Sequence, residues 1–241
     1  MNSIFVTGTD TEVGKTVAST ALLQALTARG LSTLAMKPVA AGCEWQTAAG
    51  SNGEAQAPRW CNEDALALNA AASQMLPYDL LNPYALQAAI APHIAAREEQ
   101  REIELDRLLT SLQRIQQYRA DYVVIEGAGG WQLPLNDQGL CMPSFVQASG
   151  AGVVLVVGLQ LGCLNHALLS AAAIVADGCT LCGWIGVNNQ PQSMARQAEN
   201  IDYLRQHLAA PCLGILPYVD NWQQHNLGQY LTVDALLPEP A

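Results

Sequence analysis

The segment that most constrains this chain is GTDTEVGKT, residues 8–16, because it lies between a predicted strand over 3–7 and a predicted helix over 14–28. A glycine-rich turn between a strand and a helix leaves backbone N–H groups free at the start of the helix, where they can surround phosphate oxygens. A strand, loop and helix in this order are also a typical unit of a parallel sheet. The segment therefore predicts an α/β fold with a phosphate-binding loop.

Two side chains of this loop have predicted roles. Lys15 can reach the terminal phosphates of a nucleotide, and the hydroxyl of Thr16 can join the shell of a magnesium ion. The spacing differs from the common motif, since five residues separate Gly8 from Gly14 and Thr9 stands where the first glycine is usual. We interpret the segment as a variant phosphate-binding loop; a structural turn is the alternative.

The rest of the chain alternates short β-rich runs with longer segments of helical periodicity. This pattern predicts a mostly parallel central sheet flanked by helices, as in P-loop NTPases, within a single domain over 1–241. Further strands are predicted over 33–36, 122–126, 153–157, 181–188 and 213–216. Further helices are predicted over 66–72, 103–119, 165–177 and 196–207. Residues 43–61 show no period and predict a long surface loop.

Charge and cysteine usage restrict the partners and the compartment. Eleven Lys and Arg residues against 21 Asp and Glu residues give a formal net charge of −10. This charge disfavours nucleic acid and membrane surfaces and favours small-molecule ligands. The first residues lack the pattern of a signal peptide, and the seven cysteines are expected to be reduced thiols, so a cytoplasmic location is predicted.

Two carboxylates are candidates for the second element of a phosphate site, which holds the metal ion. Glu126 ends the apolar run DYVVIEGAGG, so we expect it at the carboxyl edge of the sheet, beside the loop. A solvated glutamate at a strand end is the alternative. Asp64, in NEDALAL, lies near the start of a predicted helix, where an N-cap role is an equally good interpretation.

Lys37 is a candidate for binding the transferred phosphate. It ends a predicted strand in MKPVAAG, and Lys15 and Lys37 are the only lysines of the sequence. An ammonium group at the carboxyl edge of a parallel sheet can balance charge during phosphoryl transfer. The alternative is a solvated loop lysine.

The segment LGCLN, residues 161–165, precedes another predicted helix. Free N–H groups at that helix start could hold a substrate carboxylate, although Asn165 as an ordinary N-cap is at least as good an interpretation. Cys163 and His166 suggest a nucleophile and a base, but no carboxylate stands beside them in the sequence to orient the histidine, so this hypothesis is weak.

Several motifs together resemble the dethiobiotin synthetase family. They are GTDTEVGKT at 8–16, KPVAAG at 37–42, NEDALAL at 62–68, NPY and APH within 82–93, EGAGGW at 126–131, LGCLNHALL at 161–169 and GILPY at 214–218. The likeness spans nearly the whole chain. It implies that one amine of 7,8-diaminopelargonic acid captures CO2 as a carbamate, that ATP phosphorylates the carbamate, and that the second amine closes the ureido ring and expels phosphate.

The resemblance also implies which residues take part, with ATP and Mg²⁺ as cofactors. The implied catalytic residues are Lys37, Lys15 and Thr11, and the implied metal ligands are Thr16, Asp64 and Glu126. The implied nucleotide site is Glu12, Val13, Gly14, Lys15, Thr16, Val17, Asp64, Glu126, Gly127, Ala128, Gly129, Asn188, Asn189, Pro217, Tyr218, Val219 and Gln224. The implied substrate site is Thr11, Lys37, Ala41, Leu161, Gly162, Cys163 and Asn165, with the helix start at 161–165 supplied by the partner subunit of a homodimer.

Four positions depart from the family pattern. Ala41 stands where Ser or Thr is usual in the family, and Gln160 stands where a basic residue is common. Some members have a substrate-binding tyrosine at the position of Asn200, and a ribose-contacting acid occurs in the family near the position of Gln224. Nearby Tyr203 could replace that tyrosine. Three alternatives stay open. The departures favour a catalytically altered paralogue, and the variant loop is also compatible with a partitioning-type P-loop ATPase. The third alternative is an amidotransferase-type ligase, which would need a glutaminase domain for which 241 residues leave no room.

Overall fold

A six-stranded parallel sheet forms the centre of the molecule, which we describe from a computed structural model covering residues 1–46 and 57–237. The strand order is β10-β9-β8-β1-β7-β2. The strands are β1 (Asn2–Gly8), β2 (Thr33–Met36), β7 (Tyr122–Gly130), β8 (Gly152–Gly158), β9 (Leu181–Val187) and β10 (Cys212–Leu216). All six predicted strands are confirmed. Their apolar runs are almost wholly buried because helices cover both faces of the sheet.

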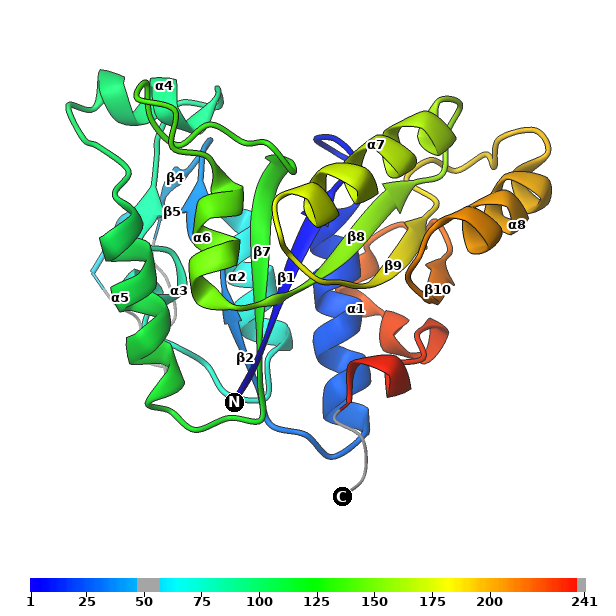
Figure 1. Cartoon of the computed structure of the whole chain (residues 1–241). Coiled ribbons are helices and arrows are strands. Elements are labelled where there is room, and N and C mark those ends of the chain that lie inside the picture. The colour runs from blue at the N-terminus through cyan, green and yellow to red at the C-terminus, as the bar shows by residue number, and fades with distance from the viewer. Residues whose placement is uncertain (47–56, 238–241) are drawn as a thin grey trace.

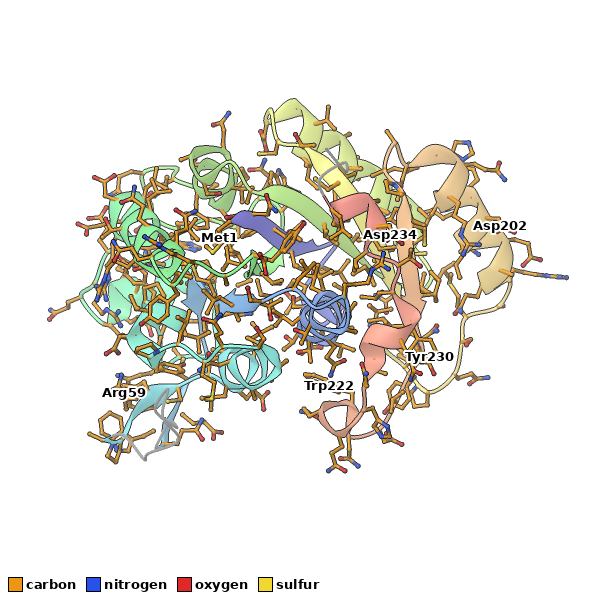
Figure 2. All side chains as sticks on the ribbon, turned by 90° about the horizontal axis from the view of Figure 1, so that it is seen from below. Met1, Arg59, Asp202, Trp222, Tyr230 and Asp234 are labelled. Carbon is orange, nitrogen blue, oxygen red and sulfur yellow. The ribbon has the colours of Figure 1, made fainter. Side chains whose placement is uncertain are left out.

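The helices form a layer on each side of the sheet (Figure 1). They are α1 (Lys15–Ala28), α2 (Glu63–Ala71), α3 (Tyr78–Leu81), α4 (Pro92–Glu98), α5 (Leu105–Gln116), α6 (Met142–Ser149), α7 (Cys163–Ala176) and α8 (Gln197–His207). Helices α1 and α2 lie on one face, and α6 and α7 lie on the other (Figures 1 and 2). The mostly parallel α/β architecture predicted from the sequence is therefore confirmed.

Two small strand pairs lie outside the central sheet. Strand β3 (Val39–Ala40) pairs in parallel with β6 (Tyr84–Ala85), and β4 (Glu44–Gln46) pairs antiparallel with β5 (Arg59–Cys61). The prediction of a loop over the whole of 43–61 is therefore wrong at its two ends, where cross-strand partners such as Trp45 and Trp60 pair. The middle of that prediction, 47–56, lies outside the described residues.

The parallel strands bring the predicted site residues to one edge of the sheet. In the pairing of β2 with β7, Met36 is opposite Ile125, so Lys37, directly after β2, and Glu126, within β7, follow as neighbours. Strand β1 runs beside β7 and ends at Gly8, where the phosphate loop begins. Along the described chain, no helix combines the length and apolar composition needed to cross a membrane.

Three 3₁₀ turns near the C-terminus pack back on the domain: η1 (Trp222–Gln224), η2 (Leu227–Tyr230) and η3 (Asp234–Leu236). The carbonyl oxygen of the Gln24 side chain in α1 accepts hydrogen bonds from the N–H groups of Leu227, at 2.8 Å, and Gly228, at 3.1 Å. Gly228 lies so close to α1 that an added Cβ would be 2.6 Å from the backbone nitrogen of Ala25. The chain after β10 is thus held directly against the helix that follows the phosphate loop.

This contact predicts that Gly228→Ala lowers the free energy of unfolding by about 2 kcal/mol, because the clash is with backbone atoms that cannot rotate away. Urea unfolding of the two proteins measures the difference. Equal midpoints would mean that η2 moves off α1 at little cost.

Candidate active site

The phosphate loop turns sharply into α1 at Gly14. Gly14 is the N-cap of α1 and has a φ of 90°, in the left-handed region. A Cβ at this position would lie 2.6 Å from Cγ1 of Val187 at the end of β9. Both the backbone conformation and the lack of space therefore require glycine here. The resulting helix start has no side-chain cap, which leaves its N–H groups available to an anion.

Lys15 lies folded against its own loop. Its Nζ donates to the carbonyl oxygen of Asp10 at 2.9 Å, and the Asp10 carboxylate accepts from the N–H of Thr11 at 2.7 Å. Burial, together with the nearby charge of Lys37, lowers the pKa of Lys15 to about 8. A cation that is partly desolvated and repelled by a second cation is stabilised by an incoming anion, so Lys15 suits a phosphate ligand.

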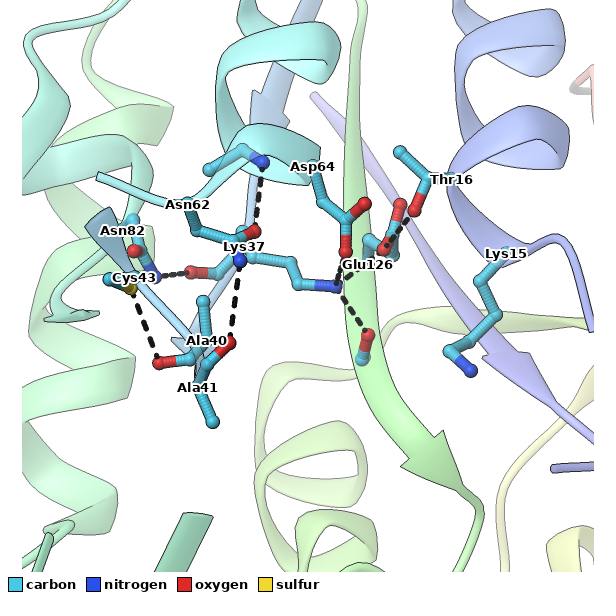
Figure 3. Close-up of polar contacts among 12 residues, drawn as sticks. Lys15, Thr16, Lys37, Ala40, Ala41, Cys43, Asn62, Asp64, Asn82 and Glu126 are labelled. Atoms are coloured by element: carbon cyan, nitrogen blue, oxygen red, sulfur yellow. Dashed lines mark hydrogen bonds and ion pairs between the residues drawn. The ribbon is translucent and has the colours of Figure 1, made fainter. Parts of the chain in front are cut away.

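Lys37 is buried between two carboxylates, as Figure 3 shows. Its Nζ lies 2.5 Å from Oε1 of Glu126 and 3.4 Å from Oδ2 of Asp64, and it also donates to the carbonyl of Gly127 at 3.1 Å. Burial by itself would lower the pKa of Lys37, but the charges of Glu126 and Asp64 outweigh it and raise that pKa above its ordinary value. The solvated loop lysine considered from the sequence is therefore wrong.

Glu126 also contacts the phosphate loop. The hydroxyl of Thr16 donates to Oε1 of Glu126 at 3.0 Å, so the three predicted metal ligands and Lys37 form one connected group. Glu126 is fully buried, and among the described residues its Oε2 has no hydrogen-bond partner. The solvated strand-end glutamate is therefore also wrong. Two carboxylates and a hydroxyl make an oxygen-only donor set with an unused acceptor, which is the chemistry that Mg²⁺ prefers.

Asp64 does not cap the helix that carries it. The N-cap of α2 is Asn62, whose side-chain oxygen accepts from the N–H of Ala65 at 3.3 Å. Asp64 lies in the first turn, and its side chain is 38% exposed and turned toward Lys37 (Figure 3). The N-cap interpretation of Asp64 is wrong because the helix begins earlier than its apolar periodicity indicates.

The residues predicted to surround the nucleotide base lie on the other side of the phosphate loop from Lys37. The side-chain nitrogen of Asn188 donates to the carbonyl of Leu216 at 3.3 Å, and its buried Oδ1 has no partner. The side-chain nitrogen of Asn189 donates to the carbonyl of Glu12 at 3.1 Å, which joins the end of β9 to the loop. Pro217, Tyr218 and Val219 directly follow β10.

A small cavity of about 150 Å³ lies beside Asn188. Its lining is Leu159, Gln160, Leu161, Asn188, Gln190, Gln192 and Met194. Gln224 lies in η1, and among the described residues no hydrogen bond joins its side chain to the loop or to Asn188.

The segment 161–165 stands apart from the Lys37 group. Gly162, with a φ of 99°, is the N-cap of α7, and Asn165 lies inside the helix, so the N-cap interpretation of Asn165 is wrong. Leu161 is 97% exposed, whereas Cys163 is buried and burial raises the pKa of its thiol, which disfavours a nucleophile. Within the described chain, no hydrogen bond connects this segment to Lys37.

Three residues that hold the site were missed by the sequence reasoning: Asn62, Tyr78 and Asn82. The side chain of Asn82 donates to the carbonyl of Lys37 at 2.7 Å. The NPY motif at 82–84 was noted only as part of a family pattern, and its first residue marks this contact.

Known proteins of one family are similar to nearly the whole chain. A family model described as an AAA domain matches residues 2–226. The "ATP-dependent dethiobiotin synthetase BioD" of Marinobacter nauticus is 45% identical over 98% of both chains. The protein of the same name from Xanthomonas campestris (strain 8004) is 48% identical over 95% of this chain and 96% of its own. The chain belongs to the ATP-dependent dethiobiotin synthetase family. The resemblance read from the motifs is confirmed.

Solved structures similar to the chain show the P-loop fold. The MinC:MinD cell division complex of Aquifex aeolicus aligns with a TM-score of 0.54 at 13% identity, covering 97% of this chain and 89% of that one. A ParA family ATPase of Chlorobium tepidum aligns with a TM-score of 0.52 at 15% identity, covering 100% and 95%. These likenesses concern the fold alone; the family membership rests on the dethiobiotin synthetases.

The burial of Glu126 predicts that Glu126→Gln lowers the free energy of unfolding by about 3 kcal/mol, because it leaves a buried ammonium short of a partner. Asp64→Asn is the matched control, and it should cost much less because Asp64 is partly solvated. Denaturant unfolding without nucleotide or metal measures both. Equal costs for the two variants would contradict a dominant Lys37–Glu126 pair.

Proposed function

We propose that this chain converts 7,8-diaminopelargonic acid, CO2 and ATP to dethiobiotin, ADP and phosphate. The observation that carries the proposal is the buried Lys37, held between Glu126 and Asp64, with Glu126 also accepting a hydrogen bond from Thr16 of the phosphate loop. This arrangement supplies charge and position for phosphoryl transfer without a covalent nucleophile on the protein. The membership of the chain in the dethiobiotin synthetase family supports this choice of substrates.

The proposed reaction has three steps. An amine nitrogen of the diamine bonds to CO2 and loses a proton, which gives a carbamate. A carbamate oxygen then takes the γ-phosphoryl group, and the bond between that group and ADP breaks. Finally the second amine attacks the carbamate carbon and loses a proton, phosphate leaves with the bonding electrons, and the ureido ring closes.

Lys37 and Lys15 bring positive charge to the carbamate and the γ-phosphate. Both side chains are buried in the ligand-free chain, and Lys37 is neutralised by carboxylates while Lys15 contacts a loop carbonyl. Anionic substrate oxygens would compete for both ammonium groups. We place Thr11 beside the diamine, because the loop brings its hydroxyl 3.8 Å from the Cβ position of Gly129 in the EGAGG segment.

Thr16, Asp64 and Glu126 would hold Mg²⁺, which would supply charge neutralisation between the nucleotide phosphates. The unpartnered Oε2 of Glu126 supports this role. The first turn of α1, with Glu12, Val13 and Val17 around it, and the backbone of 127–129 would surround the phosphates.

The nucleotide base would lie against Asn188 and the segment Pro217–Val219, with Asn189 closing the site toward the loop. The unused acceptor of Asn188 is the group that would accept a hydrogen bond from an exocyclic amine, and this supports adenine. Gln224 can offer the ribose only a neutral amide.

Ala41 leaves the substrate side of the site without the hydroxyl that is usual in the family. Ala41 is half-buried after β3, and its carbonyl accepts from the side chain of Asn62 at 3.5 Å. The backbone at this position is therefore tied to the site even though its side chain carries no polar group. We expect Ala41 to affect affinity rather than the class of reaction.

We further propose a homodimer in which the α7 start of one subunit completes the substrate site of the other. Helix α7 carries no charged residue and exposes Leu169 and Val175 by 62% and 61%, and Leu161, just before its N-cap, is 97% exposed. An uncharged apolar helix face of this kind is typical of a subunit interface. The helix N-terminus at Gly162 would meet the substrate carboxylate there. All seven cysteines are free, which favours a reducing compartment such as the cytoplasm.

The test is phosphate release from ATP with Mg²⁺ and bicarbonate, with and without the diamine, while the product is followed by mass. Diamine-dependent release with a ring-closed product is expected. Lys37→Ala should lower kcat by about 10²-fold or more, because it removes charge stabilisation at the transferred group. The control Arg114→Ala, on the exposed face of α5, should keep full turnover. Normal turnover by Lys37→Ala would refute the assignment.

The proposed homodimer leads to a second prediction. Leu169→Glu should yield monomers by light scattering, because it places a charge in an apolar contact, and it should raise the KM for the diamine by about ten-fold through loss of the partner's helix start. Tyr118→Glu, which changes another exposed apolar residue at the end of α5, is the control. A wild-type monomer with full activity would contradict the shared site.

A further inference from the structure

Lys37 is fixed through its backbone as well as through its side chain. Its N–H donates to the carbonyl of Leu81 at 2.7 Å. Its carbonyl accepts from the side-chain nitrogen of Asn82, also at 2.7 Å (Figure 3). The same Asn82 nitrogen donates to the carbonyl of Tyr84 at 3.3 Å. The end of α3 therefore holds both backbone groups of the buried lysine.

The orientation of Asn82 depends on one hydroxyl. The O–H of Tyr78, at the start of α3, donates to Oδ1 of Asn82 at 3.0 Å. Both side chains are buried, so water does not offer Oδ1 an alternative partner. This bond fixes which end of the amide faces the carbonyl of Lys37.

The same hydroxyl holds the helix that carries Asp64. Its oxygen accepts from the N–H of Asn62 at 2.7 Å, and Asn62 is the N-cap of α2. Asp64 follows two residues later in the first turn, with its carboxylate 3.4 Å from the ammonium of Lys37. One buried oxygen thus joins the two segments whose side chains meet at the site.

We propose that Tyr78 is a positioning residue, whose hydroxyl sets the placement of Lys37 relative to Asp64 for the phosphoryl transfer proposed above. The chain of contacts runs from the N-cap of α2 through Tyr78 and Asn82 to the backbone of Lys37. The catalytic consequence rests on the proposed function. The hydrogen bonds that join Tyr78 to Lys37 lie within the protein and need no bound ligand.

The electrostatics explain why such a support matters. Lys37 is attracted strongly by Glu126, and Asp64 is partly solvated and free to rotate toward water. Without a fixed backbone on both sides, the long lysine side chain could follow Glu126 away from Asp64. Small displacements of groups that act in phosphoryl transfer are costly, because the protein contributes mainly position and charge.

Tyr78→Phe tests the proposal, with Tyr122→Phe as the matched control. Tyr122 is equally buried, and its hydroxyl donates to the carbonyl of Leu236 at 2.9 Å, at the opposite edge of the sheet. Tyr78→Phe removes two hydrogen bonds and Tyr122→Phe removes one, so both variants should lose stability, and only the readouts at Lys37 separate a positioning role from a structural one. Tyr78→Phe alone is expected to lower kcat by about ten-fold or more, with the KM for ATP near the wild-type value.

A second readout needs neither nucleotide nor metal. The chain has only two lysines, so protein labelled with ¹³C at lysine Cε gives two side-chain signals, which Lys37→Ala assigns. Tyr78→Phe should move the Lys37 signal and leave that of Lys15 in place, whereas Tyr122→Phe should move neither. This readout stands even where the wild-type chain makes no dethiobiotin, so it separates failure of this inference from failure of the proposed function.

The proposal is overturned by a folded Tyr78→Phe protein whose Lys37 signal and turnover match the wild type, or by equal losses in the Tyr122→Phe control. Should Tyr78→Phe not fold, Asn82→Ser replaces it. That variant removes the hydrogen bond from the Asn82 amide to the carbonyl of Lys37, and it leaves the hydrogen bond between Tyr78 and Asn62 in place. The same two readouts then decide, and an unmoved Lys37 signal refutes the coupling.

Discussion

The arrangement of this site depends on the buried ion pair between Lys37 and Glu126. Each charge would be costly alone in an interior position, so the backbone must bring the two side chains together. The register of β2 and β7, with Met36 opposite Ile125, provides that placement. Glu126 then has one oxygen occupied by Lys37 and Thr16 and the other without a partner. The ion pair therefore compensates the two buried charges, while Oε2 of Glu126 can still accept a cation.

The distribution of positive charge supports the same view. The chain has a formal net charge of −10, yet its only two lysines lie buried at the carboxyl edge of the sheet. Two ammonium groups at one edge of an acidic protein favour small anions over extended anionic surfaces, which would meet repulsion elsewhere. The fold is shared with MinD and ParA proteins, so it is the site rather than the architecture that argues for small-molecule chemistry.

Much of this could be predicted from local sequence, and the remainder depended on distant contacts. Buried parallel strands are apolar throughout, so all six were visible, as was the loop from Gly8 to Thr16. The role of Asn62 as the N-cap was hidden because Asn62 and Asp64 are both good caps and only the backbone path decides between them. The hydroxyl of Tyr78 bridges residues 16 and 4 positions away, and no periodicity signals such a contact.

The family departures concern side chains, whereas the frame of the site is tied largely through backbone groups. Lys37 is held by its N–H and carbonyl, and Ala41 is held by its carbonyl, so a change of side chain at position 41 leaves these ties intact. Under the proposed function, loss of the usual hydroxyl would remove a contact to substrate without moving Lys37 or Asp64. A site built in this way separates the placement of charge, which the reaction class requires, from the polar contacts that tune affinity.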